Sequence, residues 1–79
     1  MKTIKDLQIA ISFDPELIDE KDRKGVVGNL EESIWKYFHK FGVIIPNGTA
    51  VECGYGYEPI DVMYHIVDFK KETITFVVE

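Results

Sequence analysis

Cysteine is almost missing from this chain, since Cys53 is the only one among 79 residues. No disulfide can form within the chain, which predicts a reducing compartment. No apolar run reaches the roughly 18 residues that a transmembrane helix needs, and the N-terminus lacks the apolar stretch of a secretory signal. We therefore expect a cytoplasmic protein that does not enter a membrane.

Basic residues are also scarce, because nine Lys and Arg stand against fourteen Asp and Glu. The formal net charge of −5 repels a phosphate backbone and argues against direct nucleic-acid binding. Motifs of catalysis and metal binding are missing as well, and Gly54-Tyr55-Gly56 is not followed by the rest of a phosphate-binding loop. We expect no catalytic residue, metal or cofactor, and a protein that is not an enzyme.

The length allows one compact domain, over residues 1–79, and excludes two. A chain of this size buries only roughly 60% of the surface that its unfolded form exposes. Added buried area from a partner or a second copy would stabilise it. A homodimer is therefore one of the open expectations.

Alternating apolar residues predict four strands. The first strand is expected at 6–13, and the others are expected at 49–57, 61–69 and 73–79. The short connections after the second and third strands favour hairpins, so the last three strands should form an antiparallel meander. The pattern does not show which of these strands pairs with the first.

Two helices are predicted between the first and second strands. Asp14 is a capping acceptor and Pro15 suits a first helical turn, which predicts a short helix at 15–22. Asn29 is a second N-cap, for a helix that ends near Gly42. One face of this helix is apolar: Leu30, Ile34, Tyr37, Phe38 and Phe41. The predicted class is α+β, a two-layer sandwich of order β-α(α)-β-β-β with an amphipathic helix on a mostly antiparallel four-stranded sheet.

Alternation within the strands assigns side chains to the two faces of the predicted sheet. Tyr64 and Ile66 are expected to face the helix, which leaves Met63, His65, Val67 and Phe69 on the open face. The register of the second strand stays open, and one of its two registers adds two tyrosines to that face. An apolar open face is typical of a protein contact. The predicted binding residues on the sheet are Tyr55, Tyr57, Met63, His65 and Val67.

A second candidate site is an acidic run: Asp14, Glu16, Asp19, Glu20 and Asp22. A calcium loop would need a central glycine and a closing glutamate, and the run has Pro15 and an apolar pair instead. One interpretation is a solvated helix face. The other is that the carboxylates imitate a phosphate track and occupy the basic site of a nucleic-acid-handling enzyme.

The leading functional hypothesis is a non-catalytic protein-binding module. It would be a small acidic inhibitor, of the phage anti-defence or immunity type, that blocks a larger protein partner. One alternative is a small-ligand-binding protein or minor enzyme that uses Cys53 and His65. Another is a structural subunit that assembles with copies of itself.

Overall fold

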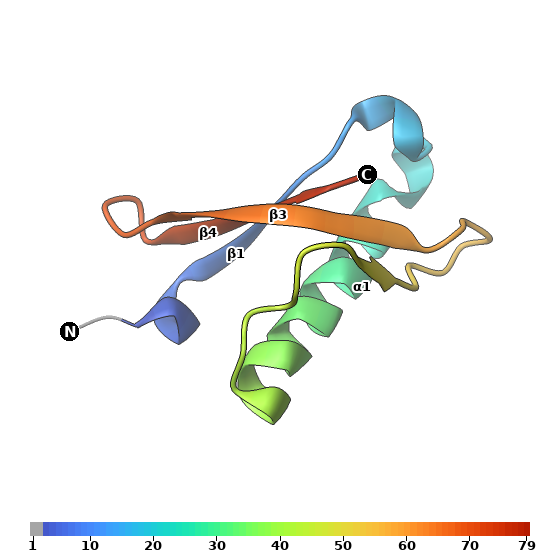
Figure 1. Ribbon diagram of the computed structural model, residues 1–79. Helices are drawn as coiled ribbons and strands as arrows, with labels where there is room; N and C mark the ends of the chain where they lie inside the picture. The colour runs from blue at the N-terminus through green and yellow to red at the C-terminus, as the bar shows by residue number, and fades with distance from the viewer. Residues whose placement is uncertain (1–2) are drawn as a thin grey trace.

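A four-stranded sheet and one long helix form the two layers of the computed structural model, which describes residues 3–79 (Figure 1). The strands are β1 (Gln8–Ser12), β2 (Thr49–Val51), β3 (Ile60–Asp68) and β4 (Thr73–Val78). The helix is α1 (Glu20–Lys36), and a π-helical turn (Tyr37–Phe41) extends it. Short 3-10 turns lie at Ile4–Asp6 and Pro15–Leu17.

The strand order in the sheet is β1-β4-β3-β2. The two pairings β2–β3 and β3–β4 are antiparallel, whereas β1 pairs with β4 in parallel. A parallel pair needs a long crossover connection, and the chain between β1 and β4 contains α1 and the other two strands. The predicted α+β sandwich with a mostly antiparallel sheet is confirmed, and the partner of the first strand is β4.

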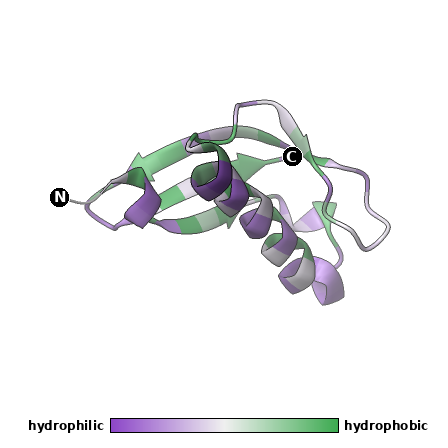
Figure 2. Cartoon of the chain, turned by 90° about the horizontal axis from the view of Figure 1, so that it is seen from below, coloured by the Kyte–Doolittle hydropathy of each residue, from purple (hydrophilic) through white to green (hydrophobic). Residues whose placement is uncertain are grey.

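The core lies between the sheet and α1. Val26, Leu30, Ile34 and Phe38 are spaced four residues apart, so they form one buried stripe. The stripe packs on the inner side chains of the strands, which include Ile9, Val51, Ile60, Val62, Ile74, Phe76 and Val78. The opposite side of α1 is polar, as the view from below shows (Figure 2). Only one face of the sheet is covered by the helix (Figure 1).

The predicted division into helices at 15–22 and 29–42 is wrong. The first segment forms only the 3-10 turn, and α1 then runs from Glu20 straight through Gly25 and Gly28. Each interior glycine costs about 1 kcal/mol relative to alanine. Burial of the apolar stripe outweighs this cost, which local propensity alone does not include. No helix in the described part of the chain is long and apolar enough to cross a membrane.

The helix also exposes a residue that the pattern assigned to its apolar face. Phe41 is 61% exposed, whereas Phe38 is 4% exposed and its ring packs edge-on against Phe76 at 6.3 Å. The cause is the π-helical turn, whose wider winding rotates Phe41 away from the stripe. Gly42, with φ of 70°, then ends the helix in the left-handed conformation.

The second strand is much shorter than predicted at 49–57, since β2 ends at Val51. Three consecutive residues, Gly54, Tyr55 and Gly56, have φ of 74°, 62° and 82°. Positive φ is incompatible with a strand. The segment is therefore a turn, and neither of its tyrosines belongs to the sheet.

Two phenylalanine variants test the effect of the π-helical turn. Phe38→Ala should lower the free energy of unfolding by about 3–5 kcal/mol, because it leaves a cavity in the core. Phe41→Ala should change it by less than about 0.5 kcal/mol, since that ring is mostly exposed. Urea unfolding followed by circular dichroism measures both. Equal losses would mean that Phe41 packs in the core.

Candidate protein-binding face of the sheet

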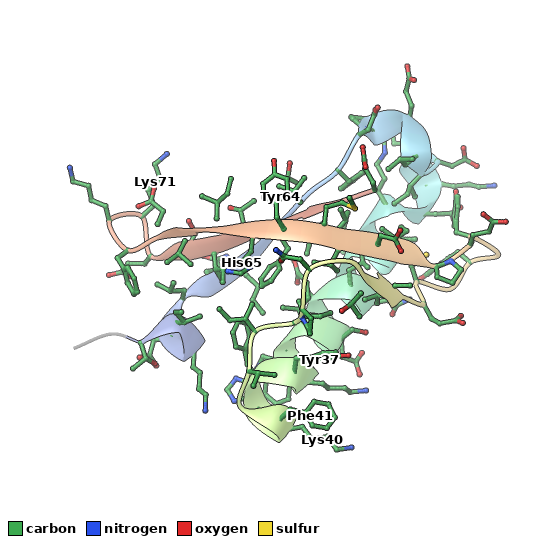
Figure 3. All side chains as sticks on the ribbon, in the orientation of Figure 1. Tyr37, Lys40, Phe41, Tyr64, His65 and Lys71 are labelled. Atoms are coloured by element: carbon green, nitrogen blue, oxygen red, sulfur yellow. The ribbon has the colours of Figure 1, made fainter. Side chains whose placement is uncertain are left out.

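The side of the sheet that α1 does not cover carries large apolar side chains. Met63, Tyr64 and Ile66 on β3 are 40%, 49% and 54% exposed. Their neighbours across the strands are Thr75 and Val77 on β4 and Ala10 on β1. We call these six residues the open face: Ala10, Met63, Tyr64, Ile66, Thr75 and Val77. Figure 3 shows Tyr64 on the side of β3 that is turned away from the helix.

A β-bulge decides which side chains of β3 reach the open face. Val62 pairs with Val78, but the next residue of β4, Val77, pairs with Tyr64, so Met63 is an extra residue. Side chains alternate with a period of two, so one inserted residue reverses the face of every residue after it. Beyond Met63, the strand therefore has the opposite register to the one predicted by alternation.

The expected faces of four residues are therefore wrong. His65 and Val67, predicted on the open face, point to the helix side, where they pair with Phe76 and Ile74. Tyr64 and Ile66, predicted to face the helix, lie on the open face: they are the residues that the sequence prediction missed. Met63 is exposed, as predicted. The only available signal was that consecutive residues, such as Val62, Met63 and Tyr64, are apolar instead of alternating with polar ones, which does not reveal the position of a bulge.

His65 lies between the sheet and the helix layer (Figure 3). Its ring centroid is 5.8 Å from that of Phe76, and its Nδ1 is buried without a hydrogen-bond partner among the described residues. A buried polar atom without a partner is costly. His65 thus lies on the core side of the sheet, away from the surface where binding was predicted.

Tyr57, which was predicted as a binding residue on the sheet, forms hydrogen bonds with the start of α1 instead. Its hydroxyl accepts a hydrogen bond from the backbone N–H of Asp19 at 2.9 Å and donates one to Oδ2 of Asp22 at 2.9 Å. The N–H of Asp19 lowers the pKa of Tyr57 most strongly. Burial, the hydrogen bond to Asp22 and the negative charges of both carboxylates together outweigh that effect and raise the pKa above its ordinary value. Tyr57 therefore links the turn at 54–57 to the start of α1.

Two more contacts join this turn to α1. Nδ2 of Asn29 donates a hydrogen bond to the carbonyl oxygen of Cys53 at 2.8 Å. The phenol of Tyr55 lies against Gly25, where a Cβ atom would overlap its hydroxyl. Tyr55 is still 59% exposed, but it lies on the helix rather than on the sheet. We call the contacts of Tyr55, Tyr57 and Asn29 with their partners the helix clasp.

The acidic run is partly occupied by local structure. Asp14 accepts a hydrogen bond from the backbone N–H of Glu16 and begins the 3-10 turn, and Asp22 accepts from Tyr57. The exposed carboxylates that remain are those of Glu16, Asp19 and Glu20. The run therefore does not present five equivalent charges to a partner.

Cys53 is fully buried, and its Sγ lies at weak hydrogen-bonding distance from the carbonyl oxygens of Gly54 (3.8 Å) and Glu58 (3.6 Å), which share its one S–H proton. Burial raises the pKa of the thiol, the hydrogen bond with its own backbone lowers it, and the nearby charge of Glu52 raises it further. The net pKa is above the ordinary value. A buried thiol with a raised pKa is a poor nucleophile, because the thiolate is the reactive form.

The fold and the open face together define a class: a small two-layer α+β protein in which one helix covers one side of a mixed four-stranded sheet. Comparison with protein-family models, curated proteins and solved structures gives no match. Within residues 3–79, no three His, Cys, Asp or Glu side chains are arranged to hold a metal ion. The chain's own surface is therefore the basis for any functional proposal.

Two glycine variants test the helix clasp. Gly28→Ala should raise the free energy of unfolding by about 0.5–1 kcal/mol, because no atom lies near the added methyl group and alanine favours the helix. Gly25→Ala should gain less, since the ring of Tyr55 must move away. In a Tyr55→Ala background, the two gains should be equal. Equal gains in the unaltered chain would show that Tyr55 does not pack on α1.

The stability of the protein should fall at alkaline pH because of Cys53. The folded state holds the thiol proton more tightly than the unfolded state does, because burial raises the pKa of the thiol. The contribution of Cys53 to the free energy of unfolding is therefore fully present below pH 9.0 and is lost as the pH rises through the folded-state pKa. Urea unfolding at several pH values measures the free energy of unfolding. Above pH 9.0, this free energy should fall less for Cys53→Ala than for the unaltered chain. An unchanged slope would contradict differential titration of this thiol. Tyr57→Phe is the control, since it should remove only the part that begins above pH 10.0.

Proposed function

We propose that this protein is a non-catalytic protein-binding module that docks on a larger protein through the open face. The observation that carries the proposal is the group formed by Met63, Tyr64 and Ile66, which are 40–54% exposed side by side on the uncovered face. Clustered apolar side chains on a small domain mark an interaction surface more often than scattered ones do.

The composition and setting of the open face suit an interface. Its centre contains Tyr64 and Met63, two residue types that are enriched in interface cores. Polar side chains surround it, including those of Gln8, Ser12 and Asp68. The side chains are fixed on hydrogen-bonded strands, so binding requires little ordering of the backbone. A partner would therefore bury the apolar centre and keep the rim in contact with water.

The net charge favours a foreign partner over a second copy. Two copies would each bring a formal charge of −5, and like charges oppose association. A larger protein with an apolar patch and a basic border would instead be attracted. In this proposal the bound module acts as an inhibitor by covering that patch.

The other functional hypotheses have less support. Mimicry of a phosphate track by the acidic run is weakened because Asp14 and Asp22 are engaged in local hydrogen bonds. A minor enzyme built on Cys53 and His65 is weakened because the thiol is buried and the imidazole lies on the core side of the sheet. Self-assembly through the open face remains an alternative that the experiment below distinguishes.

A charge on the open face should weaken binding strongly. Ile66→Asp places a carboxylate at the centre of the proposed interface, and Phe41→Asp makes the same change at an exposed site at the end of the helix. A partner captured from cells by the unaltered chain should bind Phe41→Asp equally well. It should bind Ile66→Asp at least about 30-fold more weakly, as expected for a hot-spot residue worth about 2 kcal/mol.

Two results would contradict this docking mode. One is a partner whose affinity does not change in Ile66→Asp or in Tyr64→Ala. The other is a dimer, seen by light scattering at low and high salt, that Ile66→Asp converts to a monomer, which would show that a second copy covers the open face. Unfolding curves of each variant confirm that the fold is retained.

A further inference from the structure

The two edges of the sheet differ in how they are protected from pairing with another strand. At one edge, β2 has only three residues, and the part of β3 that extends past it contains the bulge at Met63. Short edge strands and bulges are common devices against unwanted pairing. At the other edge, β1 (Gln8–Ser12) contains no charged residue, no proline and no register shift. The edge of β1 is therefore open to an added strand.

The backbone of β1 has hydrogen-bonding groups directed away from the sheet. The N–H of Gln8 donates to the carbonyl oxygen of Glu72 at 2.9 Å, so Gln8 faces β4. Alternate residues of a strand direct their N–H and C=O groups to opposite sides. Ile9 and Ile11 therefore point theirs outward, and no backbone hydrogen bond from outside the sheet reaches them within residues 3–79. An extended chain is the natural partner for such a row of groups.

A groove runs beside this edge, between β1 and α1. Its volume is about 490 Å³, within the usual range of ligand sites. Leu7 and Ile9 provide its apolar side, and Trp35 on α1 lies opposite. Gly28 also lines the groove and has no atom within 4 Å of the place where a Cβ would stand, so this part of the helix is open. Side chains of an added strand would enter the groove.

Trp35 and Glu31 give the groove its chemical character. Trp35, the only tryptophan of the chain, is 53% exposed. The centroid of its ring lies 4.2 Å from that of His39. Glu31 is half-buried in the groove wall and forms no ion pair with any described residue, whereas Glu32 pairs with Lys36 at 3.3 Å. The groove thus offers an aromatic surface next to an unpaired carboxylate. Its other charged lining residues are Glu32 and Lys5, and Lys5 forms no ion pair with Glu31.

We propose that the edge of β1 and this groove bind an extended peptide segment of a partner protein, with an apolar residue and a Lys or Arg two positions apart. The segment adds a fifth strand to the sheet. Residues two positions apart in a strand point to the same side and are about 6.6 Å apart. The apolar side chain packs on Ile9 and Trp35, and the basic one pairs with Glu31. A second copy is disfavoured because its own β1, Gln-Ile-Ala-Ile-Ser, contains no Lys or Arg that could pair with Glu31.

Selection from a displayed library of random extended peptides tests the chemistry. The full chain should enrich sequences with the apolar and basic residues two positions apart, and the affinity of one enriched peptide is then measured by the fluorescence of Trp35. Glu31→Lys should weaken binding by about tenfold or more, as expected for loss of a charge-assisted contact. Glu52→Lys, which makes the same charge change just after β2, at the opposite edge, should leave the affinity unchanged.

Methylation of the peptide tests strand addition. One peptide is N-methylated at the alternate amides that would face β1, and a second peptide at the other set, which would face water. Only one of the two should lose binding, by about tenfold or more, because only one set donates hydrogen bonds to the edge. Ile66→Asp should bind the unmethylated peptide normally, so failure of the open face as a docking site would not affect this result.

Three results would overturn the proposal. The first is the absence of an enriched pattern, or the same pattern on Glu31→Lys. The second is equal affinity of both methylated peptides. The third is a dimer whose dilution changes the fluorescence of Trp35, which would assign the edge to a second copy.

Discussion

The extra residue at Met63 is the constraint on which both sides of the sheet depend. It lets Val62 remain in the core while Tyr64 and Ile66 turn outward and His65 and Val67 turn inward. Without the bulge, the rest of β3 would present the opposite set of side chains to α1. The apolar open face and the orphaned Nδ1 of His65 are therefore two results of one local irregularity. Bulges often occur where a strand must direct a side chain to a functional surface.

The helix clasp connects the two segments that carry most of the polar tertiary contacts. Tyr57 reaches Asp19 and Asp22, and Asn29 reaches the backbone at Cys53, so the turn after β2 is fixed to the first half of α1. These contacts span 38, 24 and 35 residues of sequence. They give that end of the molecule polar contacts in addition to the burial of the apolar stripe. The open face and the edge of β1 lie outside this region, and no side-chain hydrogen bond between distant segments of residues 3–79 reaches them.

Several features could be predicted because local chemistry decides them. Alternation located β3 and β4, and the capping signal of Asp14 located a helical turn at Pro15, although the helix predicted at 15–22 forms only the 3-10 turn Pro15–Leu17. The spacing of Leu30, Ile34 and Phe38 gave the buried face of the helix, and so the two-layer class followed. The candidate site was predicted only as an apolar open face. Of its residues on the sheet, Met63 was placed correctly, and Tyr64 and Ile66 were assigned to the wrong side.

The sequence by itself determined the α+β class, the amphipathic helix and the acidic charge, because periodicity and composition act over a few residues. Only the tertiary structure decided the parallel pairing of β1 with β4, the passage of α1 through Gly25 and Gly28, and the faces of β3 beyond the bulge. Each of these depends on energies between distant segments: burial of the stripe outweighs the low helix propensity of glycine, and pairing with β4 accommodates one extra residue. A local sequence pattern does not include these interaction energies between distant segments.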